Sequence, residues 1–334
     1  MGSTSFVVIL HGALAASPNV LALSERAPSA LEPGAASTDA AAATGELGAE
    51  LGESCSVCSS RHFLMVHEGD HESATALVDL LEADQRRFFG LFSAAGFALQ
   101  EIDHPLVWVL LNNRRELATL SRETEHRDLS WLDAYYSPRT NGVALLRSQA
   151  APTRRALPEP AMSADATPVA CLAPAAGVDA VRAVHELAHQ LAFNSGLMRR
   201  GVTYPLWVAE GMADYFAAVV SECGGRRSSD SMSSPHSSDT TSGPWLPLRQ
   251  LMRVTELPDD DPAAVSSIYD QAQSLFGFLL STRRGQLVAF LSAMADADPG
   301  PTSGGEIAAR FVAAFGDPDG IEQTWTGSVG HCRQ

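Results

Sequence analysis

The spacing of apolar and polar positions divides the chain into a first half that contains short strands and a second half made of helices. Continuous apolar runs at Phe63–Val66 and Leu106–Leu111 are typical of buried strands. Between them, from Glu72 to Ala95, apolar side chains recur every three or four residues, which predicts a helix that ends at Gly96.

A hairpin is predicted later in the first half. A short helix over Arg114–Leu120 is followed by Ala134–Leu146, which has the pattern of a strand, a turn and a strand. The pair Asn141-Gly142 is typical of the reversal between two antiparallel strands.

The second half has helical periodicity almost throughout. Asp179 is placed to cap a helix over Val181–Phe193, and Pro205 suits the first turn of a helix that continues to Val220. Further helical segments are Leu246–Leu257, Ala263–Thr282, Gln286–Met294, Glu306–Phe315 and Ile321–Trp325. The two halves together predict an α+β fold, with a mixed sheet in a small N-terminal lobe and a mainly helical C-terminal lobe.

Segments rich in Ala, Ser, Gly and Pro separate these parts. They predict a leader or tether at 1–60, the N-terminal lobe at 61–150, a linker at 151–176 and the helical lobe at 177–330, with a disordered insertion at 224–244. Phe6–Leu10 and the alanines after it resemble a shortened signal peptide without a basic start. An extracytoplasmic location is slightly favoured, and a cytoplasmic one stays open.

Composition excludes several classes of protein. With 334 residues and 45% apolar content, the chain can bury a full core. A net charge of −16 without a basic stripe argues against nucleic-acid binding, and no apolar run approaches the ~18 residues of a membrane span. For Cys55 and Cys58 three roles stay open: a disulfide, half of a metal site, or no role. Composition does not determine the oligomeric state.

The segment Val181–Phe193, VRAVHELAHQLAF, combines two histidines and a glutamate in an otherwise apolar helix. His185 and His189 are four residues apart, so they lie on one helix face about a turn from each other and can bind one metal ion. Glu186 lies beside this face and can act on a metal-bound water, whose pKa zinc lowers to roughly 7. The segment therefore predicts half of a catalytic zinc site.

A third ligand has to come from another segment. Glu210 lies in the second helix, within PLWVAEGMADYF, which can return antiparallel after a turn around Asn194-Ser195-Gly196. Asp214 is one turn beyond Glu210 and can accept a hydrogen bond from the outer nitrogen of a ligand histidine. His236, in the insertion, is not expected to be a ligand.

HELAH followed by EGMAD at this spacing resembles the metal helix and the glutamate helix of the gluzincin zinc metallopeptidases. WVAEGMADYF and the later YDQAQSLFGFLL are similar to the peptidase-MA-like group, and most of all to its uncharacterised bacterial family, domain of unknown function 1570. The resemblance implies one Zn²⁺ per chain and hydrolysis of peptide bonds, but no particular substrate. The implied ligands are His185, His189 and Glu210, with Glu186 as general base.

The resemblance implies two further features. The related families place a tyrosine-led helix after the glutamate helix, which makes Tyr269 a candidate to stabilise the developing oxyanion; a core role is the alternative. Competing candidates are Tyr135, Tyr136, Arg283 and Arg284. In gluzincins a strand at the border of the cleft between lobes pairs with extended substrate, so Val143–Leu146 is a candidate for that strand. The alternative is an ordinary hairpin that packs in the N-terminal lobe.

A second stretch, His67-Glu-Gly-Asp-His71, fits the same five-residue pattern. Gly69 and Asp70 replace the uncharged helix formers of the other copy, and a strand is predicted just before it. We therefore expect His67 and His71 to lie in a solvated strand-to-helix turn and to bind no metal.

These patterns predict a zinc-dependent metallopeptidase that acts on a peptide or protein substrate. Two alternatives stay open at this point. One is a catalytically inactive zinc-bearing scaffold or binding domain, and the other is a metallohydrolase of bonds other than peptide bonds.

Overall fold

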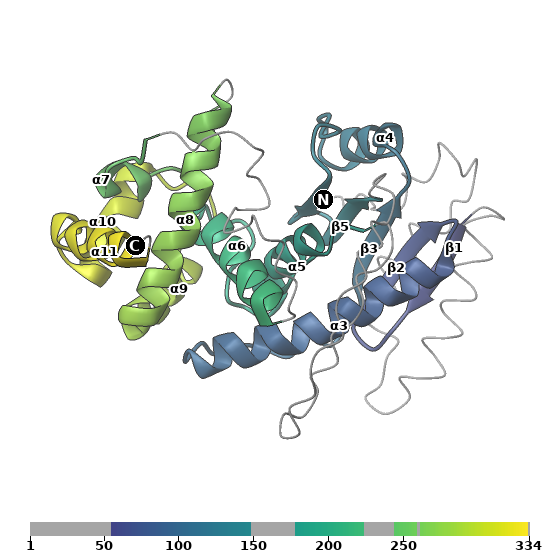
Figure 1. Cartoon of the computed structure of the whole chain (residues 1–334), viewed down its shortest axis with the longest axis horizontal. Coiled ribbons are helices and arrows are strands. Elements are labelled where there is room, and N and C mark those ends of the chain that lie inside the picture. The colour runs from purple at the N-terminus through teal and green to yellow at the C-terminus, as the bar shows by residue number, and fades with distance from the viewer. Residues whose placement is uncertain (1–54, 148–177, 224–243, 259–260, 333–334) are drawn as a thin grey trace. The chain divides into compact units, whose positions relative to one another are not determined.

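A computed structural model describes residues 55–147, 178–223, 244–258 and 261–332 (Figure 1). It divides into two compact units, one of Met1–Ala83 with Asp103–Ala183 and the other of Asp84–Ile102 with Val184–Gln334. The signal-like start, the linker at 151–176 and the insertion up to residue 243 lie outside the described residues. Each unit is described by itself.

The first unit is built on a five-stranded mixed sheet in the order β1-β2-β3-β5-β4 (Figure 1). The strands are β1 (Cys55–Ser59), β2 (Phe63–Glu68), β3 (Leu106–Leu111), β4 (Ala134–Ser137) and β5 (Gly142–Leu146). β2, β3 and β5 run parallel, whereas β1 and β4 are antiparallel to their neighbours. The mixed sheet predicted from the apolar runs is confirmed.

Helices α3 (His71–Ala94) and α4 (Arg114–Thr124) meet opposite faces of this sheet. Leu117 of α4 packs in one cluster with Val66 of β2 and Val109 of β3. Successive residues of a strand point to opposite faces, so Cys58 of β1, opposite Met65 of β2, faces the other way. On that face the Cys58 side chain hydrogen-bonds Thr75 of α3.

The position of β5 corrects one prediction. β5 pairs with β3 on one side and with β4 on the other, so its backbone groups are already hydrogen-bonded and cannot take up an extended substrate. The prediction that Val143–Leu146 pairs with substrate at the border of the cleft is therefore wrong, and the alternative hairpin is confirmed. It turns at Asn141, whose φ of 56° lies in the left-handed region.

Strand β1 corrects a second prediction, because Cys55–Ser59 fell within the expected tether at 1–60. Of its five residues only Val57 is typical of strands, which left the sequence pattern without a signal. Cys55 and Cys58 are buried thiols that form no disulfide with each other. Burial raises the pKa of Cys58 to about 11, which leaves it a poor nucleophile near neutral pH.

The second unit is helical, as expected. Its helices are the end of α3 from Asp84 on, the greater part of α5 (Ala180–Asn194), then α6 (Leu206–Cys223), α7 (Leu248–Leu251), α8 (Pro262–Thr282), α9 (Arg284–Ala295), α10 (Gly304–Phe315) and α11 (Pro318–Cys332). In its core the Trp207 ring of α6 lies 5.4 Å from the Phe290 ring and 5.8 Å from the Phe311 ring, measured between centroids. None of the helices in the described ranges is long and apolar enough to cross a membrane.

Candidate metal centre

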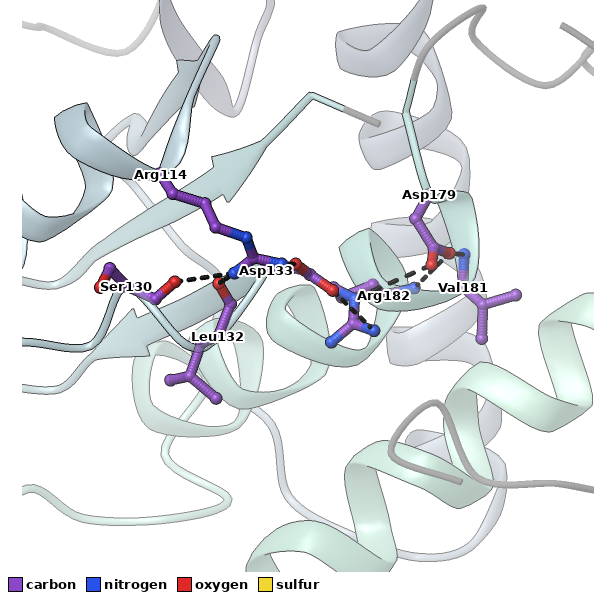
Figure 2. Close-up of polar contacts among 7 residues, drawn as sticks. All are labelled: Arg114, Ser130, Leu132, Asp133, Asp179, Val181 and Arg182. Carbon is purple, nitrogen blue, oxygen red and sulfur yellow. Dashed lines mark hydrogen bonds and ion pairs between the residues drawn. The ribbon is translucent and has the colours of Figure 1, made fainter. Parts of the chain in front are cut away.

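Helix α5 presents the two histidines of the HELAH segment. His185 and His189 are 2% and 9% exposed, which fits their place in a segment whose other residues are mostly apolar. The helix begins at an aspartate, as the sequence predicts. The Asp179 carboxylate accepts hydrogen bonds from the backbone N–H groups of Val181 at 3.1 Å and Arg182 at 3.2 Å (Figure 2).

Charged side chains hold the first turn of α5 within the first unit. Arg182 lies 3.3 Å from the Asp133 carboxylate, which also pairs with Arg114 (Figure 2). Arg114 donates in turn to the carbonyls of Ser130 at 2.7 Å and Leu132 at 2.9 Å. The start of α5 is therefore tied to the loop that leads into β4, a connection that the sequence pattern did not predict.

Helix α6 supplies the carboxylate that completes a triangle of donor atoms. The Nε2 atoms of His185 and His189 are 3.1 Å apart, and Glu210 Oε2 lies 3.3 Å from the first and 3.5 Å from the second. Ligands about 2.0–2.1 Å from a tetrahedral zinc are separated by about 3.3 Å, so the three atoms are spaced as such ligands would be. His185, His189 and Glu210 therefore form a group that could hold a metal ion.

The protonation pattern of the cluster also suits a cation. The Nδ1 atom of His185 lies 2.7 Å from Asp214 Oδ1, an arrangement in which Nδ1–H donates and the Nε2 lone pair is left facing Glu210. A lone pair and a carboxylate repel each other unless a proton or a metal ion lies between them. The hydrogen bond that His185 donates to Asp214 also fixes the ring orientation, as is usual for a ligand histidine.

Charges within the cluster shift two pKa values in opposite directions. Burial by itself would lower the pKa of His185, but the charge of Asp214 and hydrogen bonds to Asp214 and Glu210 raise it well above its usual value. Burial would raise the pKa of Glu210, whereas His189 and His185 hold it well below its usual value. The cluster thus favours positive charge among its carboxylates, which is what a bound divalent cation would provide.

Glu186 and Tyr269 lie close enough to the cluster to interact with it electrostatically. Glu186 is 6% exposed, and its charge contributes to the raised pKa values of both His185 and Tyr269. Tyr269 is on α8 and is 7% exposed. Burial raises the pKa of its phenol most strongly, followed by the charges of Glu210, Asp214 and Glu186.

The four residues that competed with Tyr269 have other surroundings. Tyr135 Oη lies 3.1 Å from Thr124 Oγ1, and Tyr136 donates to Asn141 at 3.2 Å, both within the first unit. Arg283 lies at the junction of α8 and α9, where it hydrogen-bonds Gln286 at 3.4 Å. Arg284 is exposed at the first position of α9.

The other histidine pair differs from the prediction in one respect. His71 is exposed at the start of α3, as expected, but His67 is 1% exposed within β2, so a solvated turn is wrong for His67. Alternation along β2 puts His67 on the same face as Phe63 and Met65, which are fully buried. Within the described residues, no third His, Cys, Asp or Glu joins this pair in a metal-binding group.

The fold and the cluster thus define an α+β protein with a His-His-Glu group, in which the two histidines are buried, that could hold a metal ion. A family model described as "Protein of unknown function (DUF1570)" matches residues 179–300, which is less than half of the chain. The matched range includes His185, Glu186, His189, Glu210 and Tyr269. The family description names no activity, and no curated protein matches the chain.

Proposed function

We propose that this protein is a zinc-dependent metallopeptidase in which His185, His189 and Glu210 bind the metal. The carrying observation is the triangle of donor atoms with sides of 3.1, 3.3 and 3.5 Å. Two imidazoles and one carboxylate are a known ligand set of catalytic zinc, and three protein ligands leave a fourth position for water or substrate. The resemblance of HELAH and EGMAD to gluzincins supports the same choice of metal.

Glu186 is the proposed general base. It follows His185 directly, so it is turned about 100° around α5 from that ligand, and no metal-binding group of the described residues includes it. A zinc ion in this site supplies Lewis acidity, which acidifies water and polarises a carbonyl group. Glu186 accepts a proton from the attacking water as oxygen bonds to the carbonyl carbon, and returns that proton to the amine as the C–N bond breaks.

Tyr269 is the proposed donor to the oxygen that gains negative charge during the reaction. Its raised pKa keeps the phenol protonated near neutral pH, and a protonated phenol can donate a hydrogen bond. A donor held in a water-poor site is worth more than the same donor in water, because little surrounds it to screen the charge.

One experiment tests the proposed function directly. Purified protein is analysed for metal, incubated with a mixed peptide library, then treated with a chelator and reloaded with zinc. We expect about one zinc per chain and cleavage that is lost on chelation and restored by zinc. If the zinc-loaded protein cleaves no peptide, the proposal fails in favour of a scaffold or of hydrolysis of other bonds, which ester and amide substrates would distinguish.

A further inference from the structure

Helices α6 and α8 come unusually close at Gly211. A Cβ atom added to Gly211 would lie 2.3 Å from the carbonyl oxygen of Ala272 and 2.7 Å from its carbonyl carbon. Both are backbone atoms, so no side-chain rotation can relieve the overlap. Any residue other than glycine at position 211 therefore has to push α8 away from α6, by about 1 Å to restore ordinary contact.

A second glycine contact between the same helices is of a different kind. A Cβ atom added to Gly277 of α8 would lie 3.0 Å from Cδ2 and Cε2 of Tyr215 in α6. These atoms belong to a side-chain ring, which can move by a few tenths of an ångström. Gly211→Ala and Gly277→Ala are thus the same change at the same pair of helices, but only the first meets backbone.

The contact at Gly211 lies between two residues of the candidate site. Gly211 directly follows Glu210, the ligand on α6, and Ala272 is three residues after Tyr269, so Ala272 and Tyr269 share a face of α8. His185 and His189 are on α5, and no ligand of the cluster is on α8. A displacement of α8 relative to α6 therefore moves Tyr269 relative to the three ligands, because none of them is on α8.

We propose that Gly211 is a positioning residue, whose missing side chain lets α8 approach α6 and so sets the place of the Tyr269 phenol beside the metal-binding cluster. The sequence pattern did not single out Gly211, because the constraint arises from the backbone of Ala272, 61 residues later in the chain. The role in turnover rests on the proposed function, in which Tyr269 donates to the reacting oxygen. The spatial part does not depend on it.

Tyrosine labelled with ¹³C at Cζ tests the spatial part without any substrate. The chain has five tyrosines, so five signals are expected, and Tyr269→Phe assigns one of them. In the zinc-loaded protein, Gly211→Ala is expected to shift the Tyr269 signal. Gly277→Ala is expected to shift the Tyr215 signal and to leave that of Tyr269 in place, and both variants keep their zinc. An unchanged Tyr269 signal in zinc-loaded Gly211→Ala overturns the proposal.

Kinetics test whether Gly211 acts through Tyr269. A misplacement of about 1 Å can lower turnover by roughly 10²-fold, so we expect Gly211→Ala to lower kcat by up to that factor with little change in KM. In the Tyr269→Phe background the same change is expected to have no further effect, because the group that it displaces is gone. An equal fall in both backgrounds contradicts the proposal, since Gly211 would then act on another group.

A second variant covers the case in which Gly211→Ala does not fold. Ala272 is fully buried and its carbonyl group forms the contact, so we expect the larger side chain of Ala272→Val to displace α8 at the same place. Overpacking by two methyl groups is a modest change, so we expect this variant to fold. The Tyr269 signal must shift in this variant, and an unchanged signal overturns the proposal. If the wild type cleaves no peptide, the proposed function fails, but the labelled spectra still decide where Gly211 places Tyr269.

Discussion

The two His-Glu-x-x-His stretches give opposite environments to pairs of histidines with nearly the same separation. His67 Nε2 and His71 Nδ1 are 3.2 Å apart, and the Nε2 atoms of His185 and His189 are 3.1 Å apart. The first pair joins the end of β2 to the first residue of α3, whereas the second lies on one face of α5. A short distance between two imidazoles therefore does not by itself define a metal site.

The surrounding charges separate the two pairs. The pKa of His67 is lowered by burial and by the nearby His71 and Arg147, which outweigh the charge of Asp70, and its Nδ1 has no hydrogen-bond partner among the described residues. His185 instead has Asp214 on one ring nitrogen and Glu210 facing the other. A positive charge nearby disfavours a bound cation and carboxylates favour it, so we infer that Glu210 and the charge of Asp214 are what distinguish the second pair as a metal site.

The largest expected effect is loss of metal. His185→Ala, His189→Ala and Glu210→Ala each remove one of the three proposed ligands, so each variant should carry almost no zinc when measured by elemental analysis. The matched controls His67→Ala and His71→Ala should keep the zinc content of the wild type. Loss of zinc in either control would show that the first stretch takes part in metal binding.

Replacing Asp214 should weaken the site without abolishing it. Asp214→Asn keeps the size of the side chain but removes the charge that orients and polarises His185, and loss of such a partner lowers metal affinity by about 10–100-fold. Competition with a chelator of known zinc affinity measures the change. An unchanged zinc affinity would mean that Asp214 does not strengthen metal binding by His185. The surroundings of His185 would then give it no such advantage over His67.

Protonation should destabilise the first pair at low pH. Because the pKa of His67 is lowered from 6.5 in the folded protein, the unfolded chain binds more protons below that pH, and this part of the stability is lost as pH falls. Glutamine at position 67 does not titrate. The difference in unfolding free energy between the wild type and His67→Gln should therefore shrink from about pH 7.5 to about pH 5. Denaturant titrations at both pH values check this, and a constant difference contradicts it.

The smallest expected effect concerns the helix starts, where the two stretches are alike. The Asp70 carboxylate accepts a hydrogen bond from the backbone N–H of Glu72 at the start of α3. The Asp179 carboxylate accepts a corresponding hydrogen bond from a backbone N–H in the first turn of α5. Asp179→Ala should lower stability by about 1 kcal/mol, the usual worth of such a cap, and leave the zinc content unchanged. Thermal unfolding measures the change in stability. Asp70→Ala, which removes the corresponding cap of α3, serves as the control. A fall in zinc content with Asp179→Ala would show that the cap also orders the ligands.

Local patterns predicted the parts of the fold that local patterns determine. Helical spacing indicated the helix after Glu72 and the one that carries His185, and Asn141-Gly142 indicated the hairpin. Sequence spacing also indicated that Glu210 would join the two histidines, and the structure brings the three together. These features depend on residues near one another in sequence, or on one helix that packs antiparallel to the helix before it.

Features that depend on distant partners were not predictable in the same way. The prediction that Val143–Leu146 borders the substrate cleft was wrong because the sequence of a strand does not determine its position in the sheet. β4 occupies the sheet edge that β5 was expected to provide. The burial of His67 follows from the helix packed on its face of the sheet. The close approach at Gly211 depends on the backbone of Ala272, which no pattern around Gly211 indicates.

Glu186→Gln gives the most direct test of the central claim. The change keeps the size of the side chain and all three proposed ligands, but removes the carboxylate that accepts the proton of the attacking water. We expect zinc content and thermal stability near those of the wild type together with a fall in turnover of roughly 10²–10⁴-fold. Turnover close to that of the wild type, or a loss of zinc and stability in parallel with activity, would contradict the assignment of Glu186 as the general base of a zinc peptidase.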